Sequence, residues 1–414
     1  MTAFADAPAA SEPVKTWQVK TWQIVALVAL TLAVLFARRP DQFLHPYIWV
    51  EDGDPVLKDY AARGLASFWE PVSGYLILAT KLITLSSFKL SIEYAPEIAL
   101  ALTVAFTCAV VVAVALSPTH LRWPYLCAIA VLTIPVTPEV YGVSLLAFWW
   151  AGLLVVLALV WDADHGAPWL RAGYLVLGGL STPVMVPLAA LFVLRALLER
   201  RRSEFIAAGL AVAVATIQAR EIFGYHHIDY MRLIDPHVIR VAMDKFTGYF
   251  FFSQRYGRFY TGLLIVPLLG VALWQIRARL TLHFILLLLA WGAICATTAL
   301  RNPIHDINPL NGGPRYFFYP FILFSWILIW LSALSPAHVR VLVLAGCLLG
   351  VAWVYKRMTR GHDAMDWRAH IAACTQSEQY ELPIHKEGRA NDPWYVKLTG
   401  QQCRDLIAWS LIRR

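Results

Sequence analysis

The sequence predicts an all-α polytopic membrane protein of about eleven transmembrane helices, with interfacial helices in the first outer loop and a small α+β C-terminal extracytoplasmic domain. Apolar residues make up 59% of its 414 residues and charged residues only 15%, whereas soluble domains carry about 25% charged residues. Apolar runs recur at close to the length that crosses the hydrocarbon, about 20 residues. We assign the net charge of +8 to membrane topology, so nucleic-acid binding is disfavoured.

The N-terminal segment 1–20 is polar, and we expect it to be disordered and cytoplasmic. The apolar run that follows is not closed by a small-residue cleavage site, so a cleavable signal peptide is not expected. Lys15 and Lys20 should hold this end of the chain in the cytoplasm.

The apolar runs give the expected crossings of a transmembrane body that occupies 21–355. Segment 71–90 is only moderately apolar and contains Lys81 and Lys89, so we expect it to be embedded at the interface rather than to cross. The turn Ser181–Pro183 breaks a short pair of runs. The expected spans are 21–37, 93–117, 122–137, 142–161, 170–181, 183–198, 204–222, 259–276, 281–300, 315–333 and 338–355.

Loop charges set the orientation of these spans, because Lys and Arg beside spans are retained in the cytoplasm. With the N-terminus inside, the two most basic short loops are cytoplasmic. Arg38 and Arg39 break this rule, since they fall on the outer side of the first span. They are either anchors that snorkel at the interface or contacts to a phosphate. The outer segments are 38–92, Pro138–Glu139, 223–258, 301–314 and 356–414.

The first outer loop, 38–92, contains a cluster of carboxylates, "WVEDGDP". Asp54 followed by Pro55 is typical of a helix start, and apolar residues at helical spacing predict an amphipathic helix over 55–69. Glu51 and Asp52 would then lie before its N-terminus, where the helix dipole keeps carboxylates ionised. They could accept a proton or bind a divalent cation, or be solvated residues beside a helix cap.

The later outer segments contain further charged residues beside aromatic ones. In "LRNPIHDINPLNGGPRYFFYP" the guanidinium of Arg315 is placed to bind a phosphate, or else to snorkel beside an aromatic belt; His305 and Asp306 lie just before it. Glu139 at an outer turn could add a carboxylate to the same cavity. In segment 223–258 the adjacent residues His226 and His227 lack the spacing of metal ligands. Lys245, Arg255 and Arg258 in that segment more plausibly line a site for a lipid-linked anion.

The C-terminal segment 356–414 predicts a small domain with one helix and two strands. About 60 residues form a small core, so a covalent link would help this domain to fold. Cys374 and Cys403 are the two cysteines in a polar region, and an oxidising compartment would permit a disulfide between them.

These features together resemble the GT-C superfamily of integral membrane glycosyltransferases. The resemblance rests on Glu51–Asp52 in the first outer loop, on "PVSGYLILATKL" after it, on the late loop "GGPRYFFYP" and on the multi-span body with a C-terminal outer domain. It implies transfer of a sugar from a polyprenyl-phosphate donor to a glycan or lipid acceptor on the periplasmic face of a bacterial cytoplasmic membrane, with inversion at the sugar.

The resemblance also implies roles for individual residues. Asp52 is the expected general base and Glu51 the second candidate. If a divalent cation takes part, Mg²⁺ or Mn²⁺, this pair is expected to bind it. Arg315, helped by Lys81, His305 or Arg255, is expected to bind the donor phosphate; Glu139 and Asp306 are supporting residues. The order Glu-Asp differs from the Asp-Asp or Asp-Glu of many members, so the choice of base stays open.

Two other function classes share this topology. A transporter or flippase of a lipid-linked sugar is the main alternative, although such proteins often contain repeated halves and charges near the bilayer midplane. Here the ionisable residues gather at the outer boundary instead. A ligase or acyl-transferring membrane enzyme would be expected to centre on other loop residues, such as a catalytic His.

Overall fold

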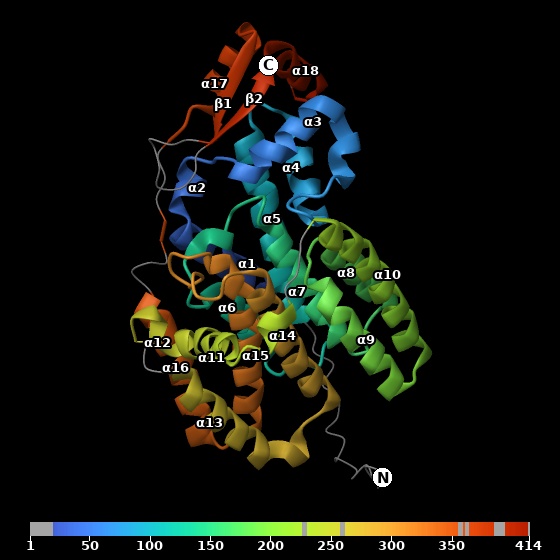
Figure 1. Cartoon of the computed structure of the whole chain (residues 1–414), viewed down its shortest axis with the longest axis vertical. Coiled ribbons are helices and arrows are strands. Elements are labelled where there is room, and N and C mark those ends of the chain that lie inside the picture. Colours follow the sequence, from blue (N-terminus) through green and yellow to red (C-terminus); the bar gives the residue numbers. More distant parts are fainter. Residues whose placement is uncertain are drawn as a thin grey trace.

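A helical body and a small domain stacked on one end of it make up the computed structural model (Figure 1). The structure describes residues 20–225, 230–256, 261–354, 359–360, 364–384 and 394–412. The predicted disordered segment 1–20 lies outside this part except for Lys20. The described chain is mostly helical, with a single small sheet near the C-terminus.

The helices of the body lie close to the apolar runs that the sequence contains. Their bounds are α1 Thr21–Arg38, α2 Pro40–Leu44, α4 Leu78–Leu90, α5 Ala95–Leu116, α6 Pro124–Thr133, α7 Ala147–Leu159, α8 Pro168–Gly179, α9 Met185–Glu199, α10 Arg202–Tyr225, α11 Pro236–Met243, α12 Tyr249–Tyr256, α13 Thr261–Ile276, α14 Leu282–Arg301, α15 Phe318–Leu334 and α16 Ala337–Val354. Short 3-10 turns are η3 Pro138–Val140, η4 Tyr230–Leu233, η7 Arg277–Arg279 and η8 Pro314–Phe317; η5 Asp244–Gly248 is a π-helical turn.

Five helices of the described chain are long and apolar enough to cross a membrane: α1, α5, α10, α14 and the helix over Pro314–Leu334. Others, such as α6 with 10 residues, are too short, because an α-helix rises about 1.5 Å per residue and the hydrocarbon is about 30 Å thick. The expected number of eleven crossings is therefore not confirmed, whereas the membrane character is.

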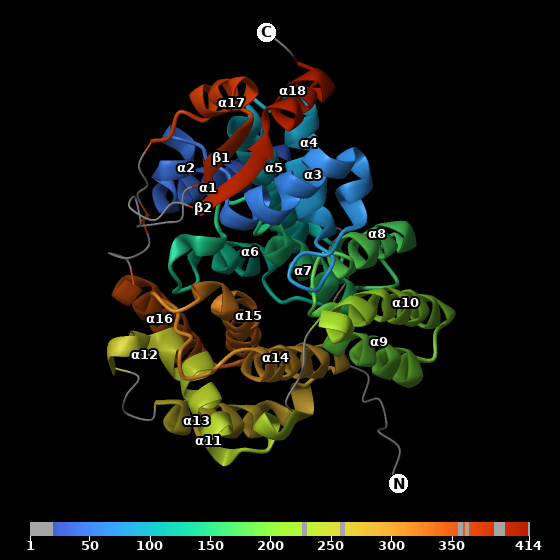
Figure 2. The same ribbon diagram turned by 45° about the horizontal axis from the view of Figure 1, so that its top comes forward.

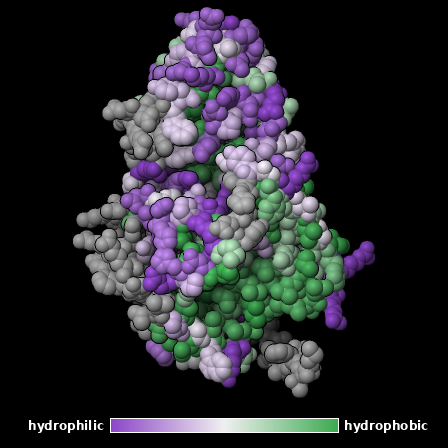
Figure 3. All heavy atoms as spheres, in the orientation of Figure 1, coloured by the Kyte–Doolittle hydropathy of each residue, from purple (hydrophilic) through white to green (hydrophobic). Residues whose placement is uncertain are grey.

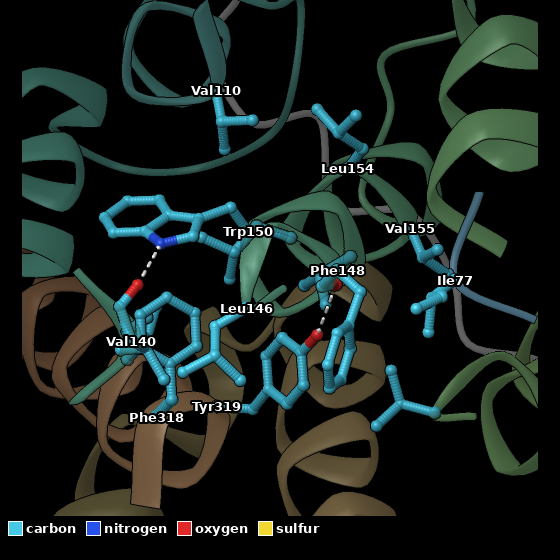
Figure 4. Packing of buried hydrophobic residues seen from close by; sticks show 14 of the residues in the cluster. Ile77, Val110, Val140, Leu146, Phe148, Trp150, Leu154, Val155, Phe318 and Tyr319 are labelled. Carbon is cyan, nitrogen blue, oxygen red and sulfur yellow. Dashed lines mark hydrogen bonds between the residues drawn. The ribbon is translucent and has the colours of Figure 1, made fainter. Parts of the chain in front are cut away.

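The core of the body lies around α7 and α15. All but one residue of α7 are buried, and α15 is buried along most of its length. Figure 4 shows the indole of Trp150 donating to the carbonyl of Val140 (2.8 Å) and the hydroxyl of Tyr319 donating to the carbonyl of Phe148 (3.3 Å). These bonds satisfy polar groups that the apolar core would otherwise leave unpaired.

The irregular segment between α6 and α7 is held by Arg38 and Arg39, both fully enclosed. Arg38 donates to the carbonyls of Leu132 (2.8 Å) and Val136 (2.5 Å). Arg39 forms an ion pair with Asp41 (2.9 Å) and donates to the carbonyl of Tyr141 (3.1 Å). Neither interpretation of these arginines from the sequence is right, since they bind backbone that has no helical partners.

The first outer loop folds as three short helical turns: π-helical η1 Asp52–Leu57, α3 Lys58–Arg63 and 3-10 turn η2 Gly64–Trp69. The single amphipathic helix predicted over 55–69 is therefore broken. The backbone of Asp54 is extended (φ −120°, ψ 109°), as at a helix start, but its carboxylate pairs with Lys58 (3.3 Å) instead of capping the turn.

The C-terminal domain contains α17 Trp367–Gln376, an antiparallel pair β1 Gln379–Ile384 and β2 Trp394–Thr399, and α18 Gly400–Trp409. The sequence predicted the first three elements, but α18 was missed, because its first residues were assigned to the end of a strand. Cys374 and Cys403 form the expected disulfide, which joins the two helices.

This domain lies against the first outer loop and α4, as Figure 2 shows. The indole of Trp367 donates to the carbonyl of Ile92 (2.8 Å), and Lys89 donates to the carbonyl of Trp409 (2.8 Å). Ile384 of β1 packs so close to Gly53 that an added Cβ would lie 1.5 Å from its Cδ1. The domain therefore contacts the loop beside the carboxylate cluster.

A buried cluster of charged side chains links α8, α9 and α10. On the side predicted to be cytoplasmic, Glu204 lies between Arg171 (2.7 Å) and Arg195 (3.0 Å), all buried.

Figure 3 shows a broad hydrophobic surface over the region of α9 and α10, whereas the C-terminal domain is hydrophilic. Exposed apolar side chains such as Leu197 and Ile206 belong to this surface, as expected for helices that face lipid.

Candidate functional site

A cavity of about 570 Å³ opens among the helix ends that the sequence assigns to the outer side. Its wall is formed by the segment before η1, the turn before α4, the starts of α7 and α9, the ends of α10 and α14, and η8 with the start of α15. A volume of this size is typical of small-molecule sites, which are about 300–1,000 Å³. Segments far apart in the sequence thus meet where the outer loops were expected to converge.

Glu51 is the carboxylate among the described residues that line this cavity. It is half-buried at the start of η1, and its Oε2 atom is buried without a hydrogen-bond partner in the described part of the chain. The indole Nε1 of Trp149, which lines the same cavity, is also buried with no partner among the described residues. Buried polar atoms are nearly always paired, so these two atoms at the cavity wall have unused hydrogen-bonding capacity.

Asp52 faces away from the cavity and is fully buried. Its carboxylate accepts hydrogen bonds from the hydroxyls of Ser144 (2.6 Å) and Thr84 (2.8 Å), and from the backbone N–H groups of Leu145 (3.1 Å) and Trp49 (3.3 Å). Burial raises the pKa of Asp52 to about 6, although these hydrogen bonds oppose the shift. With a pKa of about 6 the carboxyl group of Asp52 is still mostly ionised at neutral pH, as expected, but burial and these hydrogen bonds determine its pKa, not a helix dipole.

The two adjacent carboxylates therefore have separate environments. Asp52 ties the acidic loop to α4 and to the segment before α7, and it has no access to a substrate in the cavity. The assignment of Asp52 as first choice for the general base does not fit this geometry. Glu51, the second choice, does. A divalent cation in the cavity would meet only Glu51 of the predicted pair, and the described residues contain no cluster of three or more His, Cys, Asp or Glu side chains.

Arg315 lines the cavity as predicted, and Glu139 determines its position. The Arg315 guanidinium forms an ion pair with the Glu139 carboxylate, which also accepts from the backbone N–H of Arg315 (3.2 Å). The guanidinium carbon lies 5.1 Å from the ring centre of Tyr316. Glu139 does not itself line the cavity, so it supports Arg315 and does not supply a second carboxylate to a ligand.

Two further arginines line the cavity that the site prediction did not include, Arg232 and Arg301. The guanidinium of Arg301 lies over the ring of Tyr75 (4.8 Å), and Arg232 donates to the carbonyl of Leu300 (3.2 Å). Arg301 belongs to the same outer loop as Arg315, so the sequence could have identified it as a residue of the site. Arg232 is separated from that loop by almost seventy residues, and no motif marks it.

The remaining predicted residues lie elsewhere. Lys81 is buried against η2, where its Nζ donates to the carbonyl of Ser67 (3.2 Å), and burial lowers its pKa. His305 is exposed and stacks on His237 (4.8 Å). Asp306 is exposed as well. None of these three predicted residues lines the cavity, so neither the assignment of Lys81 and His305 to a phosphate site nor that of Asp306 as a supporting residue is supported.

Segment 223–258 contributes to the wall in a different way from that predicted. Lys245 donates to the carbonyls of His305 (2.7 Å) and Ile307 (2.6 Å), and burial lowers its pKa to about 8. Lys245 therefore fixes the loop 301–314 and does not itself line the cavity. His226, His227, Arg258 and the side chain of Arg255 lie outside the described residues.

No protein-family model, curated protein or solved structure matches this chain. The residues that line the cavity, and their contacts, are therefore the observations from which a function has to be argued.

Proposed function

We propose that this chain is a membrane glycosyltransferase that moves a sugar from a polyprenyl-phosphate donor to a glycan or lipid acceptor. Transfer takes place with inversion at the outer face of a bacterial cytoplasmic membrane. One observation carries the proposal: Glu51 shares a single cavity with Arg232, Arg301 and Arg315. A carboxylate that can take a proton and guanidinium groups that can bind a phosphate are the two requirements of this reaction.

The charge of the cavity suits an anionic donor. Three guanidinium groups and one carboxylate line it, and guanidinium groups bind phosphate through paired N–H donors. Aromatic walls from Tyr75 and Trp149 offer flat apolar surfaces, of the kind on which the C–H faces of a sugar pack. The cavity lies at the ends of α10 and α14, two helices long enough to cross a membrane, so a lipid-linked donor could reach it from the bilayer.

In the proposed reaction the acceptor hydroxyl oxygen attacks the anomeric carbon of the sugar. A new glycosidic C–O bond forms, the bond from that carbon to the phosphate oxygen breaks, and the polyprenyl phosphate leaves with the electron pair. The carboxylate of Glu51 takes the hydroxyl proton. Arg301, Arg232 and Arg315 stabilise the charge that develops on the phosphate, so a separate general acid is unnecessary.

Asp52 and Glu139 act in this proposal as positioning residues. Asp52 fixes the loop through Ser144 and Thr84, and thereby sets the direction of the neighbouring Glu51. Glu139 holds Arg315 against the cavity wall. Such support is needed because a small misplacement of a reacting group lowers the rate strongly.

The proposed topology keeps the eleven crossings expected from the sequence, with the N-terminus in the cytoplasm and the cavity and the C-terminal domain in the periplasm. In support, every described segment that forms the cavity wall comes from the ends assigned to the outer side. The short helices α8 and α9 would enter and leave the membrane as a pair. Accessibility of single cysteines placed at residues 164 and 378 to an impermeant reagent would test this orientation.

Sugar transfer by the purified protein in detergent tests the function. Membrane lipid extracts would supply acceptors, and labelled polyprenyl-phosphate sugars would be the donors. Glu51→Gln should lower the rate by about 10²–10⁴-fold, the usual contribution of a general base. The matched control is Glu93→Gln, a half-buried glutamate directly after the same outer segment, which does not line the cavity. Full activity of Glu51→Gln would show that this carboxylate is not the base.

The same assay separates the enzyme from a transporter of lipid-linked sugars. Transfer needs only one compartment, whereas transport is defined between two. Movement of the donor across sealed vesicles by a protein that forms no glycosidic bond in detergent would favour the transporter.

A further inference from the structure

A second hollow, of about 230 Å³, lies between α14 and the α11–η5 segment. We call it the side groove. Apart from Arg232, its described wall is apolar. Trp291, Cys295, Ala296 and Ala299 form one side, from α14, and residues of α11 and η5 such as Ala242 form the other.

The cavity and the side groove lie on neighbouring faces of the same helix. Thr297, Thr298 and Arg301 of α14 line the cavity, whereas Ala296 and Ala299 line the side groove. Arg232 lines both hollows. Its guanidinium donates to the carbonyl of Leu300 near the end of α14 (3.2 Å). A cationic group therefore lies at the boundary between the cavity and the side groove.

We propose that the side groove binds the hydrocarbon chain of the lipid whose phosphate lies in the cavity, at the prenyl units nearest that phosphate. This rests on the proposed function. The arrangement fits an amphiphile: an anion needs guanidinium donors, a chain needs an apolar surface, and the two parts must be joined without a gap. Arg232 supplies that junction.

The side chains of the groove favour a chain over a bulky group. Alanines on both walls leave room for a slender ligand between the helices, because small residues let another apolar surface approach a helix closely. On the outside, Ile239 of α11 is 44% exposed, and α14 is long and apolar enough to cross the membrane. The rest of the chain can therefore leave the groove directly into the bilayer.

Binding of sugar-free polyprenyl phosphate to the full chain in detergent tests this inference independently of catalysis. The dissociation constant is measured for a long polyprenyl phosphate and for methyl phosphate, which has no prenyl unit. Ala296→Trp fills the groove from α14, and Ala242→Trp fills it from α11. Gly292→Trp is the control, because an added Cβ at Gly292 meets nothing within 4 Å.

We expect each groove variant to weaken binding of the long chain by about tenfold or more, the effect of losing a few methylene contacts. Binding of methyl phosphate by these variants, and binding of both ligands by the Gly292→Trp control, should be unchanged. Equal weakening for both ligands, or wild-type binding of the long chain by both groove variants, would overturn the inference. A co-purified phospholipid that the variants displace without any change in polyprenyl phosphate binding would overturn it too.

The two proposals can fail separately. Groove-dependent binding by a wild-type protein that transfers no sugar would leave the chain site standing and remove the glycosyltransferase. Sugar transfer with no dependence on the groove variants would do the reverse.

Discussion

Gly53→Ala should destabilise the protein because the C-terminal domain occupies the space of the new methyl group. An ideal Cβ at Gly53 would lie 1.5 Å from Cδ1 of Ile384, 3.0 Å from its Cγ1 and 3.8 Å from its Cβ. Carbon atoms normally pack at about 3.5–4.0 Å, so Cδ1 would have to move by about 2 Å. Ile384 is only 1% exposed and has little room to do so.

The expected loss is about 1–3 kcal/mol, the usual effect of overpacking a core. Ile384→Ala alone should lose about 2–5 kcal/mol by leaving a cavity. The double variant should be no less stable than Ile384→Ala, because the substitution removes the two closest atoms and the next, Cβ of Ile384 at 3.8 Å, is at an ordinary distance. The coupling free energy of this cycle should therefore equal the loss caused by Gly53→Ala.

Thermal unfolding in detergent, followed by tryptophan fluorescence, would measure the four stabilities. Gly209→Ala is the matched control, since a Cβ there meets nothing within 4 Å. Strictly additive losses in the cycle would refute the argument that Ile384 and Gly53 share one space. So would a Gly53→Ala protein as stable as the control.

Three further predictions concern stability. Burial raises the pKa of Asp52 from its ordinary value near 4 to about 6, so protonation of Asp52 favours the folded state. The free energy of unfolding should therefore be higher below pH 4 than above pH 6 by about 3 kcal/mol, and it should fall as the pH rises between these values. Unfolding temperatures of Asp52→Asn should lack this pH dependence, and identical pH profiles would contradict it. Glu204→Gln should lose about 3–5 kcal/mol because the buried guanidinium of Arg171 loses its carboxylate partner, whereas Glu221→Gln on the same helix should not; equal unfolding temperatures would argue against it. Replacing Cys374 and Cys403 by Ser should cost about 3–4 kcal/mol for a separation of 29 residues; limited proteolysis that cuts wild type and variant equally fast would disprove this.

Local signals in the sequence were sufficient for most helices. The ends of α1 and α5 lie within two residues of the expected ends, because apolar runs and their polar flanks decide where a helix starts and stops. The elements of the C-terminal domain up to β2 also follow local patterns. The helix α18 was missed because "LTGQQC" has no apolar period at its start and was assigned to the end of a strand, although Thr399 and Gln402 are a capping box that the sequence contains.

The site was predictable only in part, for a physical reason. The sequence brings attention to Glu51 and Asp52 together, but the direction of each carboxylate depends on the π-helical turn η1 and on Ser144 and Thr84, which are distant in sequence. Arg315 was found because it follows a glycine turn and enters a span. Arg232 reaches the cavity only through the packing of η4 on α14, which no sequence pattern records.

The contact between Ile384 and Gly53 also concerns the order in which the protein is made. The acidic loop leaves the ribosome several hundred residues before Ile384, and chains grow at about 5–20 residues per second. For tens of seconds Gly53 and the loop around it lack their contact with Ile384. The described residues that line the cavity all precede the C-terminal domain in the chain, so this domain folds last, onto a loop whose neighbours in the body have already been made.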